Sequence, residues 1–205
     1  MTISSRRTLL RRSAALLCGL ALSSVVFAAD TPVTAPPQVL LKTSMGDIVL
    51  ELNPEKAPIT VANFLQYVKS GFYKGTVFHR VIDGFMIQGG GYDAKLVGKP
   101  TNKPIKNESN NGLSNVAYSV AMARGSDHNS ATSQFFINVA DHPPLDYPGR
   151  DGSGYAVFGM VVSGQDVVDK IKGVVVDDMK GQQNVPVVPI VITSATIVKP
   201  AKSVK

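Results

Sequence analysis

Hydrophobic and polar residues alternate along much of the chain, and this alternation predicts many short β-strands. Residues 39–44 and 48–52 are two such runs on either side of a Met-Gly-Asp corner, a pattern typical of a hairpin. Residues 77–82 and 85–88 form a second pair, joined by Asp-Gly. Because side chains at every second position of a strand share a face, polar groups from the two members of this pair can converge.

Four further runs favour strands, at residues 116–123, 133–139, 155–162 and 187–198. The last run must bend or bulge, because Pro189 has no N–H to donate to a ladder. Strand signals therefore continue almost to the end of the chain.

Two stretches change to a helical period. Residues 57–69 carry apolar side chains every three or four positions, with Pro58 in the first turn and Gly71 as a stop. Residues 165–171 repeat the pattern and predict a second helix. A loop is expected over residues 172–186, between this helix and the last strand.

Many short strands, only two helices and no βαβ rhythm favour a mainly β fold, either a closed antiparallel barrel or a sandwich. In a barrel, the two helices would cover the ends. Residues 30–38 predict a flexible lead-in, 39–198 the folded domain, and 199–205 a frayed tail. Within the domain, residues 95–115 are rich in Gly, Pro and Asn, which indicates a long ordered loop rather than a linker.

Residues 1–29 have the pattern of a cleavable export signal. Two arginine pairs precede an apolar run, and small residues at its end predict cleavage after Ala28 or Ala29. The run is short for a membrane-spanning helix, so an uncleaved anchor is the less favoured alternative, and we expect no stable membrane association after cleavage. Residues 5–11 also resemble a twin-arginine signal, but Sec signals carry such pairs too, and we favour the Sec route to the periplasm.

Charge and cysteine usage exclude several classes of function. The net charge is +6, and removal of the four arginines of the signal leaves +6 − 4 = +2, a weak basis for binding nucleic acid. Cys18, inside the signal, is the only cysteine, so disulfides and thiol catalysis are excluded in the mature protein. His79, His128 and His142 match no usual metal-ligand spacing. We therefore expect neither a metal nor another cofactor.

The candidate chemistry lies in three segments. The segment FHRVIDGFMIQGGG (residues 78–91) places Arg80 near an apolar pair, Phe85 and Met86, and an amide, Gln88. The segments MARGSDHNSATSQFFIN and LDYPGRDGSGYAVFG add further amide and apolar side chains, namely Gln134, Phe136, Leu145 and Tyr155. Together they predict an apolar pocket with one arginine, few neutral polar groups and no obvious nucleophile.

In these segments the sequence resembles the cyclophilins, the cyclosporin-binding family of peptidyl-prolyl cis/trans isomerases, and among them the bacterial periplasmic members. The similarity extends over residues 39–198. It implies an eight-stranded antiparallel barrel capped by two helices. It also implies the substrate, which is the X-Pro bond of a polypeptide.

The resemblance assigns roles residue by residue. Arg80 matches the catalytic arginine. The substrate-binding positions are the proline pocket (Phe85, Met86, Phe136 and Leu145), the pocket amides (Gln88 and Gln134), and the strand edge that hydrogen-bonds the substrate backbone (Ala123 and Arg124). Three positions depart: Pro144 stands where strongly drug-binding members have tryptophan, Tyr155 where they have histidine, and Arg124 in place of asparagine. If only its backbone is used, the change at Arg124 should matter little, whereas Pro144 predicts weak cyclosporin binding.

The leading hypothesis is a monomeric, exported isomerase that acts on proline-containing polypeptides and speeds their folding. One alternative is a chaperone or scaffold that holds proline-containing segments with little turnover. Arg80 favours the enzyme, since a pure binder has no need of that charge. A third reading, a barrel that holds a small ligand, would require a deep interior cavity.

Overall fold

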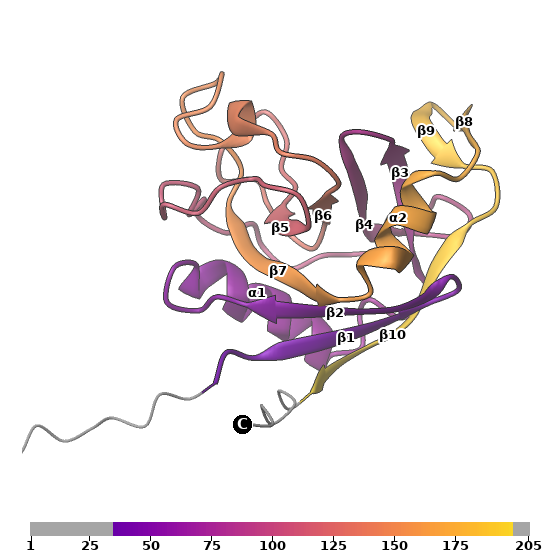
Figure 1. Cartoon of the computed structure of the whole chain (residues 1–205), viewed down its shortest axis with the longest axis horizontal. Coiled ribbons are helices and arrows are strands. Elements are labelled where there is room, and N and C mark those ends of the chain that lie inside the picture. Colours follow the sequence, from indigo (N-terminus) through magenta and orange to yellow (C-terminus); the bar gives the residue numbers. More distant parts are fainter. Residues whose placement is uncertain (1–34, 199–205) are drawn as a thin grey trace, which may run out of the picture. The chain divides into compact units, whose positions relative to one another are not determined.

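The computed structural model describes residues 35–198 of the chain. Eight strands form a ring: β1 (Gln38–Thr43), β2 (Gly46–Leu52), β3 (Thr76–Ile82), β4 (Met86–Asp93), β5 (Ser119–Met122), β6 (Phe135–Asn138), β7 (Val157–Ser163) and β10 (Ile190–Val198). Their order round the closed barrel is β1-β10-β3-β4-β6-β5-β7-β2, and every neighbouring pair is antiparallel (Figure 1). The expected eight-stranded barrel is confirmed, and the sandwich alternative is wrong.

Apolar side chains fill the barrel. Alternate residues of the strands point inward, and the largest of them meet aromatic side chains from other elements. The ring of Phe64 lies 5.1 Å from those of Tyr73 and Phe158, and 5.5 Å from that of Phe135, measured between centroids. All four residues are fully buried. An interior packed in this way does not suit the hypothesis of a small-ligand barrel.

The helices bury the faces that their periodicity predicts. In α1 (Pro58–Lys69), Val61, Phe64 and Val68 are buried, and in α2 (Gln165–Lys172), Val167, Val168 and Ile171 are buried. Both sets belong to the same hydrophobic cluster as the barrel interior, and Figure 1 shows the two helices on different sides of the barrel. Within residues 35–198, neither helix has the length and apolar character needed to cross a membrane.

Several strand limits differ from the prediction. Strand β5 begins at Ser119 rather than at residue 116, because Tyr118 has a positive φ of 64°. Strand β10 begins at Ile190, directly after Pro189, so the proline ends the preceding loop and does not interrupt the ladder. The irregularity expected in this strand occurs instead where its pairing with β1 shifts register, between Lys42 and Thr43.

The prediction of a loop over residues 172–186 is wrong, because this segment contains a second, two-stranded sheet. Strands β8 (Val176–Met179) and β9 (Gln182–Pro186) pair antiparallel outside the barrel, and β9 contacts β3. Only Val185 and Pro186 of the hairpin are buried. The hairpin therefore lacks the alternation of buried and exposed residues that predicts a strand.

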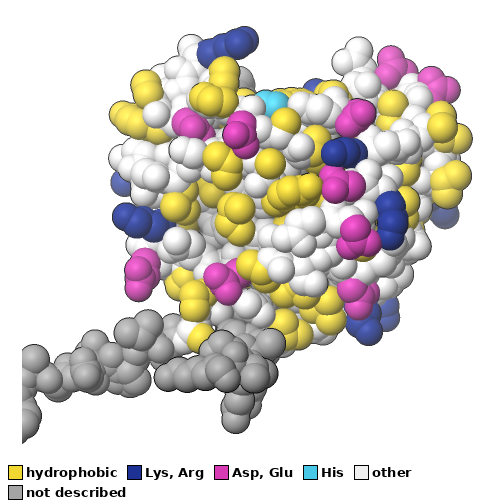
Figure 2. Space-filling model, in the orientation of Figure 1, with side chains coloured by type: hydrophobic (Ala, Val, Ile, Leu, Met, Phe, Trp, Pro, Cys, Tyr) yellow, Lys and Arg dark blue, Asp and Glu magenta, His cyan; other side chains and the backbone are white. Residues whose placement is uncertain are grey.

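The ends of the chain are outside the described residues. This holds for the export signal over residues 1–29, for most of the lead-in and for the tail at 199–205. The folded part begins with β1 at Gln38, one residue before the expected start. On the face drawn in Figure 2, acidic and basic side chains are interspersed among hydrophobic and other residues.

The long loop before β5 is ordered, and it caps the first helix. Helix α1 has Pro58 in its first turn and no side-chain cap from Ala57. The carboxylate of Glu108 instead accepts hydrogen bonds from the backbone N–H groups of Ile59 (3.0 Å) and Thr60 (2.8 Å), and from the Thr60 hydroxyl (2.7 Å). A negative charge at this end also opposes the positive end of the helix dipole.

We expect Glu108→Ala to lower the free energy of unfolding by about 1–2 kcal/mol, because it leaves two N–H groups of the first helical turn without their partner. Urea unfolding followed by circular dichroism measures this change. The control is Glu55→Ala, which removes the same charge just before α1 from an exposed side chain. Equal losses in the two variants would show that charge alone, and not capping, accounts for the effect.

Candidate active site

The strands whose inward side chains fill the barrel also carry outward apolar side chains, which form a surface on its outside. In β6, Phe135 and Ile137 point into the core, while Phe136 between them points outward. Phe136 joins a separate buried cluster with Met86, Ala121 and Val157, contributed by β4, β5 and β7. The site is therefore on the outer surface of the barrel.

A cavity of about 470 Å³ lies over this cluster. Its lining consists of Arg80, Phe85, Met86, Gln88, Ala123, Arg124, Phe136, Leu145 and Tyr155. The structure thus brings together nine of the ten residues that the sequence analysis names. The tenth, Gln134, lies beside the cavity, and its Oε1 accepts a hydrogen bond from Nε2 of Gln88 at 2.9 Å.

The polar side of the cavity comes from two paired strands. Arg80 on β3 lies directly opposite Gln88 on β4, immediately after two register shifts in this pair of strands. Arg80 is partly buried, and within residues 35–198 its guanidinium forms no ion pair. The Gln134 side chain packs on Gly91, where an added Cβ would lie 2.5 Å from Cγ of Gln134. Glycine at this position therefore makes room for the amide pair.

Ring contacts and hydrogen bonds hold the side chains on the apolar side of the cavity in place. The rings of Phe136 and Tyr155 meet edge to face at 5.6 Å, as do those of Phe85 and His142 at 4.8 Å. Nε2 of His142 donates to the carbonyl of Phe85 at 2.8 Å, and the N–H of Leu145 donates to the carbonyl of His142 at 2.9 Å. His142 therefore fixes two walls of the cavity, a role that its sequence position did not indicate.

The side chain of Arg124 forms several contacts within the protein. The side chain is only 3% exposed and forms an ion pair with Asp151. Its Nε donates to the carbonyl of Gly154 at 3.0 Å, and its guanidinium lies 4.5 Å from the centre of the Tyr155 ring. The bond from Arg124, with a smaller contribution from the backbone N–H of Gly154, holds the pKa of the Asp151 carboxyl well below its usual range. The arginine thus fastens the loop before β7 to the cavity wall.

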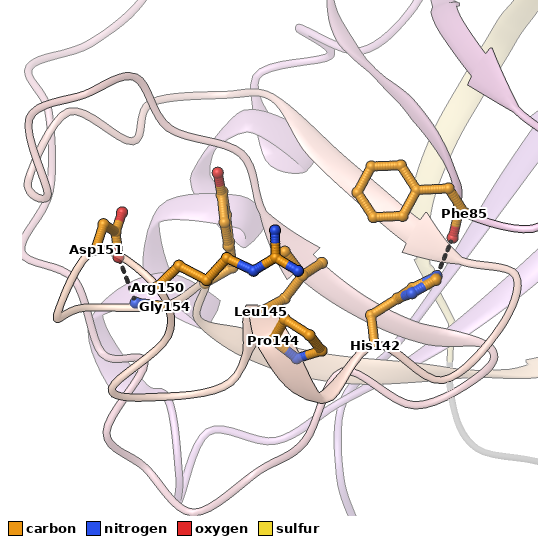
Figure 3. Close-up of a pocket in the computed structure, with 8 residues that line it drawn as sticks. Phe85, His142, Pro144, Leu145, Arg150, Asp151 and Gly154 are labelled. Atoms are coloured by element: carbon orange, nitrogen blue, oxygen red, sulfur yellow. Dashed lines mark hydrogen bonds between the residues drawn. The ribbon is translucent and has the colours of Figure 1, made fainter.

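A second pocket of about 350 Å³ adjoins the cavity (Figure 3). The sequence patterns did not predict it. It shares Phe85, Leu145 and Tyr155 with the cavity, and its remaining lining is His142, Pro144, Arg150, Asp151 and Gly154. Leu145 belongs to η1 (Pro143–Leu145), a short 3-10 helix. The signal of the pocket in the sequence is the polar, glycine-rich stretch between Leu145 and Tyr155, which by itself indicates a loop and not a pocket.

His79 is adjacent to Arg80 in the chain but does not line the cavity. It is 4% exposed, its ring lies 4.7 Å from that of Tyr92, and its Nδ1 has no hydrogen-bond partner among the described residues. Burial lowers the pKa of His79 to about 4. In the part of the chain that the structure describes, no three His, Cys, Asp or Glu side chains gather as metal ligands.

The fold and the site define a class of protein. The cavity is apolar on one side and carries Arg80 and the amide of Gln88 on the other, while its second arginine, Arg124, is paired with Asp151. Its lining contains no serine, cysteine or carboxylate. Such a site binds a ligand and stabilises charge without forming a covalent bond. Its position on the outer surface of the barrel leaves it accessible to a polypeptide.

Comparisons with known proteins identify the family. Residues 38–197 match the family described as "Cyclophilin type peptidyl-prolyl cis-trans isomerase/CLD". "Peptidyl-prolyl cis-trans isomerase A" of Dickeya dadantii is 54% identical over 178 residues, which are 87% of this chain and 93% of that protein. "Peptidyl-prolyl cis-trans isomerase B" of Escherichia coli is 52% identical over 161 residues, covering 78% and 98%. The crystal structure of a Cryptosporidium parvum cyclophilin type isomerase is similar with a TM-score of 0.66 at 27% identity, covering 81% of this chain and 99% of that chain.

The chain belongs to the cyclophilin-type peptidyl-prolyl cis-trans isomerases. It is therefore an enzyme of X-Pro isomerisation, and the resemblance found in the sequence is confirmed. The family favours the enzyme over the alternative of a binding module with little turnover.

The buried His79 predicts a loss of stability in acid. Its pKa is about 4 in the folded state and 6.5 as a free group, so between these values the unfolded state binds the proton more readily. Stability is then complete above pH 6.5 and falls as the pH decreases towards 4. From pH 7.5 to pH 5 we expect this group to remove about 2 kcal/mol from the free energy of unfolding.

Urea unfolding at the two pH values measures this loss. In His79→Gln, the free energy of unfolding should fall less between pH 7.5 and pH 5 than in wild type, by about the same 2 kcal/mol. The exposed His128 supplies the control substitution, and His128→Gln should retain the wild-type dependence. If His79→Gln and wild type lose the same free energy in acid, another group is responsible.

Proposed function

We propose that Arg80 is the catalytic residue and that the other nine named residues bind the substrate. The observation that carries this proposal is a partly buried guanidinium, without an ion pair among residues 35–198, in the lining of an apolar cavity. Removing a charge from water without giving it a partner is unfavourable, and a bound ligand can supply that partner. Its fixed position opposite Gln88 supports a role in the reaction rather than in solubility.

The chemistry requires no nucleophile. An X-Pro bond rotates over a barrier of about 18–20 kcal/mol because resonance gives its C–N bond partial double-bond character. In the twisted amide this resonance is lost, and the nitrogen recovers its lone pair. A guanidinium donates hydrogen bonds from one rigid fork, so it can reach this nitrogen and a neighbouring carbonyl together. Arg80 would therefore bind the twisted amide more strongly than either planar isomer.

One hydrogen bond is too weak to account for the whole effect. An acceleration of about 10⁵-fold needs about 7 kcal/mol, whereas a hydrogen bond to a charged group contributes about 1.5–3 kcal/mol. The remainder must come from a site that is arranged in advance and holds little water. The hydrogen bond between Gln88 and Gln134, and the contacts behind Phe85, supply this rigidity.

The remaining residues would hold the substrate on both sides of the bond. Phe85, Met86, Phe136 and Leu145 line the apolar side of the cavity, where a proline ring would pack, and Tyr155 extends this wall. Ala123 donates its N–H to the carbonyl of Gln134 at 3.0 Å. The carbonyl of Ala123 is then the group that remains for the substrate backbone. Because Pro144 replaces a large aromatic side chain, cyclosporin would bind weakly.

Arg80→Ala should lower kcat/KM by about 10²–10³-fold, the effect of removing one donor aimed at developing charge. Exchange NMR on a proline-containing test peptide measures the rate. Arg80→Lys, which keeps the charge and loses the fork, should fall between wild type and Arg80→Ala. Circular dichroism confirms that each variant is folded. Unchanged line broadening with Arg80→Ala would remove this residue from the mechanism.

We further propose that the protein is exported to the periplasm and, as a monomer, isomerises proline bonds of other exported polypeptides during their folding. The pattern of residues 1–29, which lie outside the described part of the structure, supports export. The net charge that remains after removal of its arginines gives little attraction to nucleic acid.

Expression in a Gram-negative host tests the export. Intact mass and N-terminal sequencing should find the periplasmic protein beginning at Ala29 or Asp30. The double substitution Arg6→Lys, Arg7→Lys should leave export intact by the Sec route, whereas its loss would indicate the twin-arginine route. Full-length protein confined to the cytosol would contradict export by either route.

A further inference from the structure

The second pocket continues the substrate cavity. Three side chains, Phe85, Leu145 and Tyr155, line both, so a segment that fills one is in contact with the wall of the other. Successive Cα atoms of a chain are about 3.8 Å apart, so a residue next to a proline held in the cavity can reach this pocket. The polar end of the cavity, at Arg80 and Gln88, is not shared. The pocket therefore suits the residues on one flank of the proline.

The loop that forms the far wall of this pocket is fixed in position. Arg124 binds Asp151 and the carbonyl of Gly154. Nδ2 of Asn107 donates to Oγ of Ser153 at 2.9 Å and to the carbonyl of Gly154 at 3.2 Å. Gly154 has a φ of 72°, and an added Cβ would lie 2.8 Å from the backbone at Asp146. A pocket wall held in this way is formed before any ligand arrives.

The two carboxylates at this pocket have partners within the protein, whereas its arginine is in no ion pair among the described residues. The Asp151 carboxylate is engaged by Arg124 and by the backbone N–H groups of Ser153 and Gly154. Oδ1 of Asp146 accepts from the N–H and Nδ2 of Asn115. Arg150 is exposed, and within residues 35–198 it takes part in no ion pair. The pocket thus has one cation whose charge no neighbouring carboxylate balances.

Figure 3 shows where this charge lies. The Arg150 side chain extends from its loop towards Leu145 and Pro144, so its guanidinium is over the apolar part of the lining. The imidazole in this lining, His142, donates through Nε2 to the carbonyl of Phe85 and contributes no carboxylate to pair with the guanidinium. A ligand side chain that enters here meets apolar walls and a guanidinium fork, which matches a carboxylate in geometry and charge.

We infer that this pocket is a specificity subsite for an acidic side chain, glutamate or aspartate, close to the isomerised proline. Such a subsite presupposes the proposed binding of proline in the adjoining cavity, and it adds a sequence preference to that function. Arg150 is exposed, so the preference is modest and decreases as salt screens the pair.

Four short peptides test the preference. Two carry glutamate, one immediately before the proline and one immediately after it, and two carry glutamine at the same positions. In exchange NMR at low ionic strength, we expect glutamate to raise kcat/KM about three- to fivefold over glutamine on one flank, and this ratio to approach one at 1 M salt. A glutamate-to-glutamine ratio of one on both flanks at low salt would overturn the subsite.

Substitutions assign the preference to Arg150. Arg150→Gln should bring the ratio to one, Arg150→Lys should retain most of it, and Arg150→Glu should invert it. The control is Lys42→Gln, which makes the same change in net charge on β1, four strands away from β6 in the barrel. It should keep the wild-type ratio, and an equal loss there would mean that overall charge, not Arg150, sets the preference.

The glutamine peptides separate the two levels of the proposal. If wild type turns them over and Arg80→Ala does not, the proposed catalytic site stands whatever the glutamate ratio is. If wild type turns the glutamine peptides over but shows a glutamate-to-glutamine ratio of one on both flanks, only the subsite fails.

Discussion

A strand in a closed sheet has two faces, and in this barrel both carry apolar side chains. Inward residues such as Phe135 fill the interior, and their immediate neighbours such as Phe136 build the floor of the substrate cavity. Since the side-chain period of a strand is two, a slip of one residue would exchange the floor and the core. The closed ring of antiparallel pairs prevents such a slip, because each strand is held from both sides. The precision of the site thus comes from the same pairing that gives the fold its stability.

Three arginines around the site have different environments, and their different roles follow. Arg80 lies partly buried in the cavity without an ion pair among residues 35–198, which suits a charge that acts on a ligand. Arg124 is buried and neutralised by Asp151, so it holds structure and contributes little field. Arg150 is exposed at the outer pocket. A count of basic residues in the sequence does not distinguish these cases, because the distinction depends on partners that are distant in the chain.

The sequence was informative where the signal is local. Alternation located the barrel strands, helical spacing located both helices, and the family resemblance named ten residues of which nine line one cavity. It failed where the partners are distant. The cap of α1 comes from Glu108, 48 residues beyond Thr60, and the partner of Arg124 lies 27 residues further along. The β8–β9 hairpin escaped notice because it buries little surface, so no hydrophobic pattern was required of it.

The tripeptide Asn107-Glu108-Ser109 joins two distant parts of the molecule. Glu108 holds the start of α1, while Asn107 and the Ser109 hydroxyl hold the loop at Ser153 and Gly154. Both attachments come from three consecutive residues, so a single turn of the chain holds the start of the helix and one side of the pocket wall. A change that displaces this turn would therefore reach the helix end and the pocket wall together, while Arg124 would remain as the second attachment of that wall.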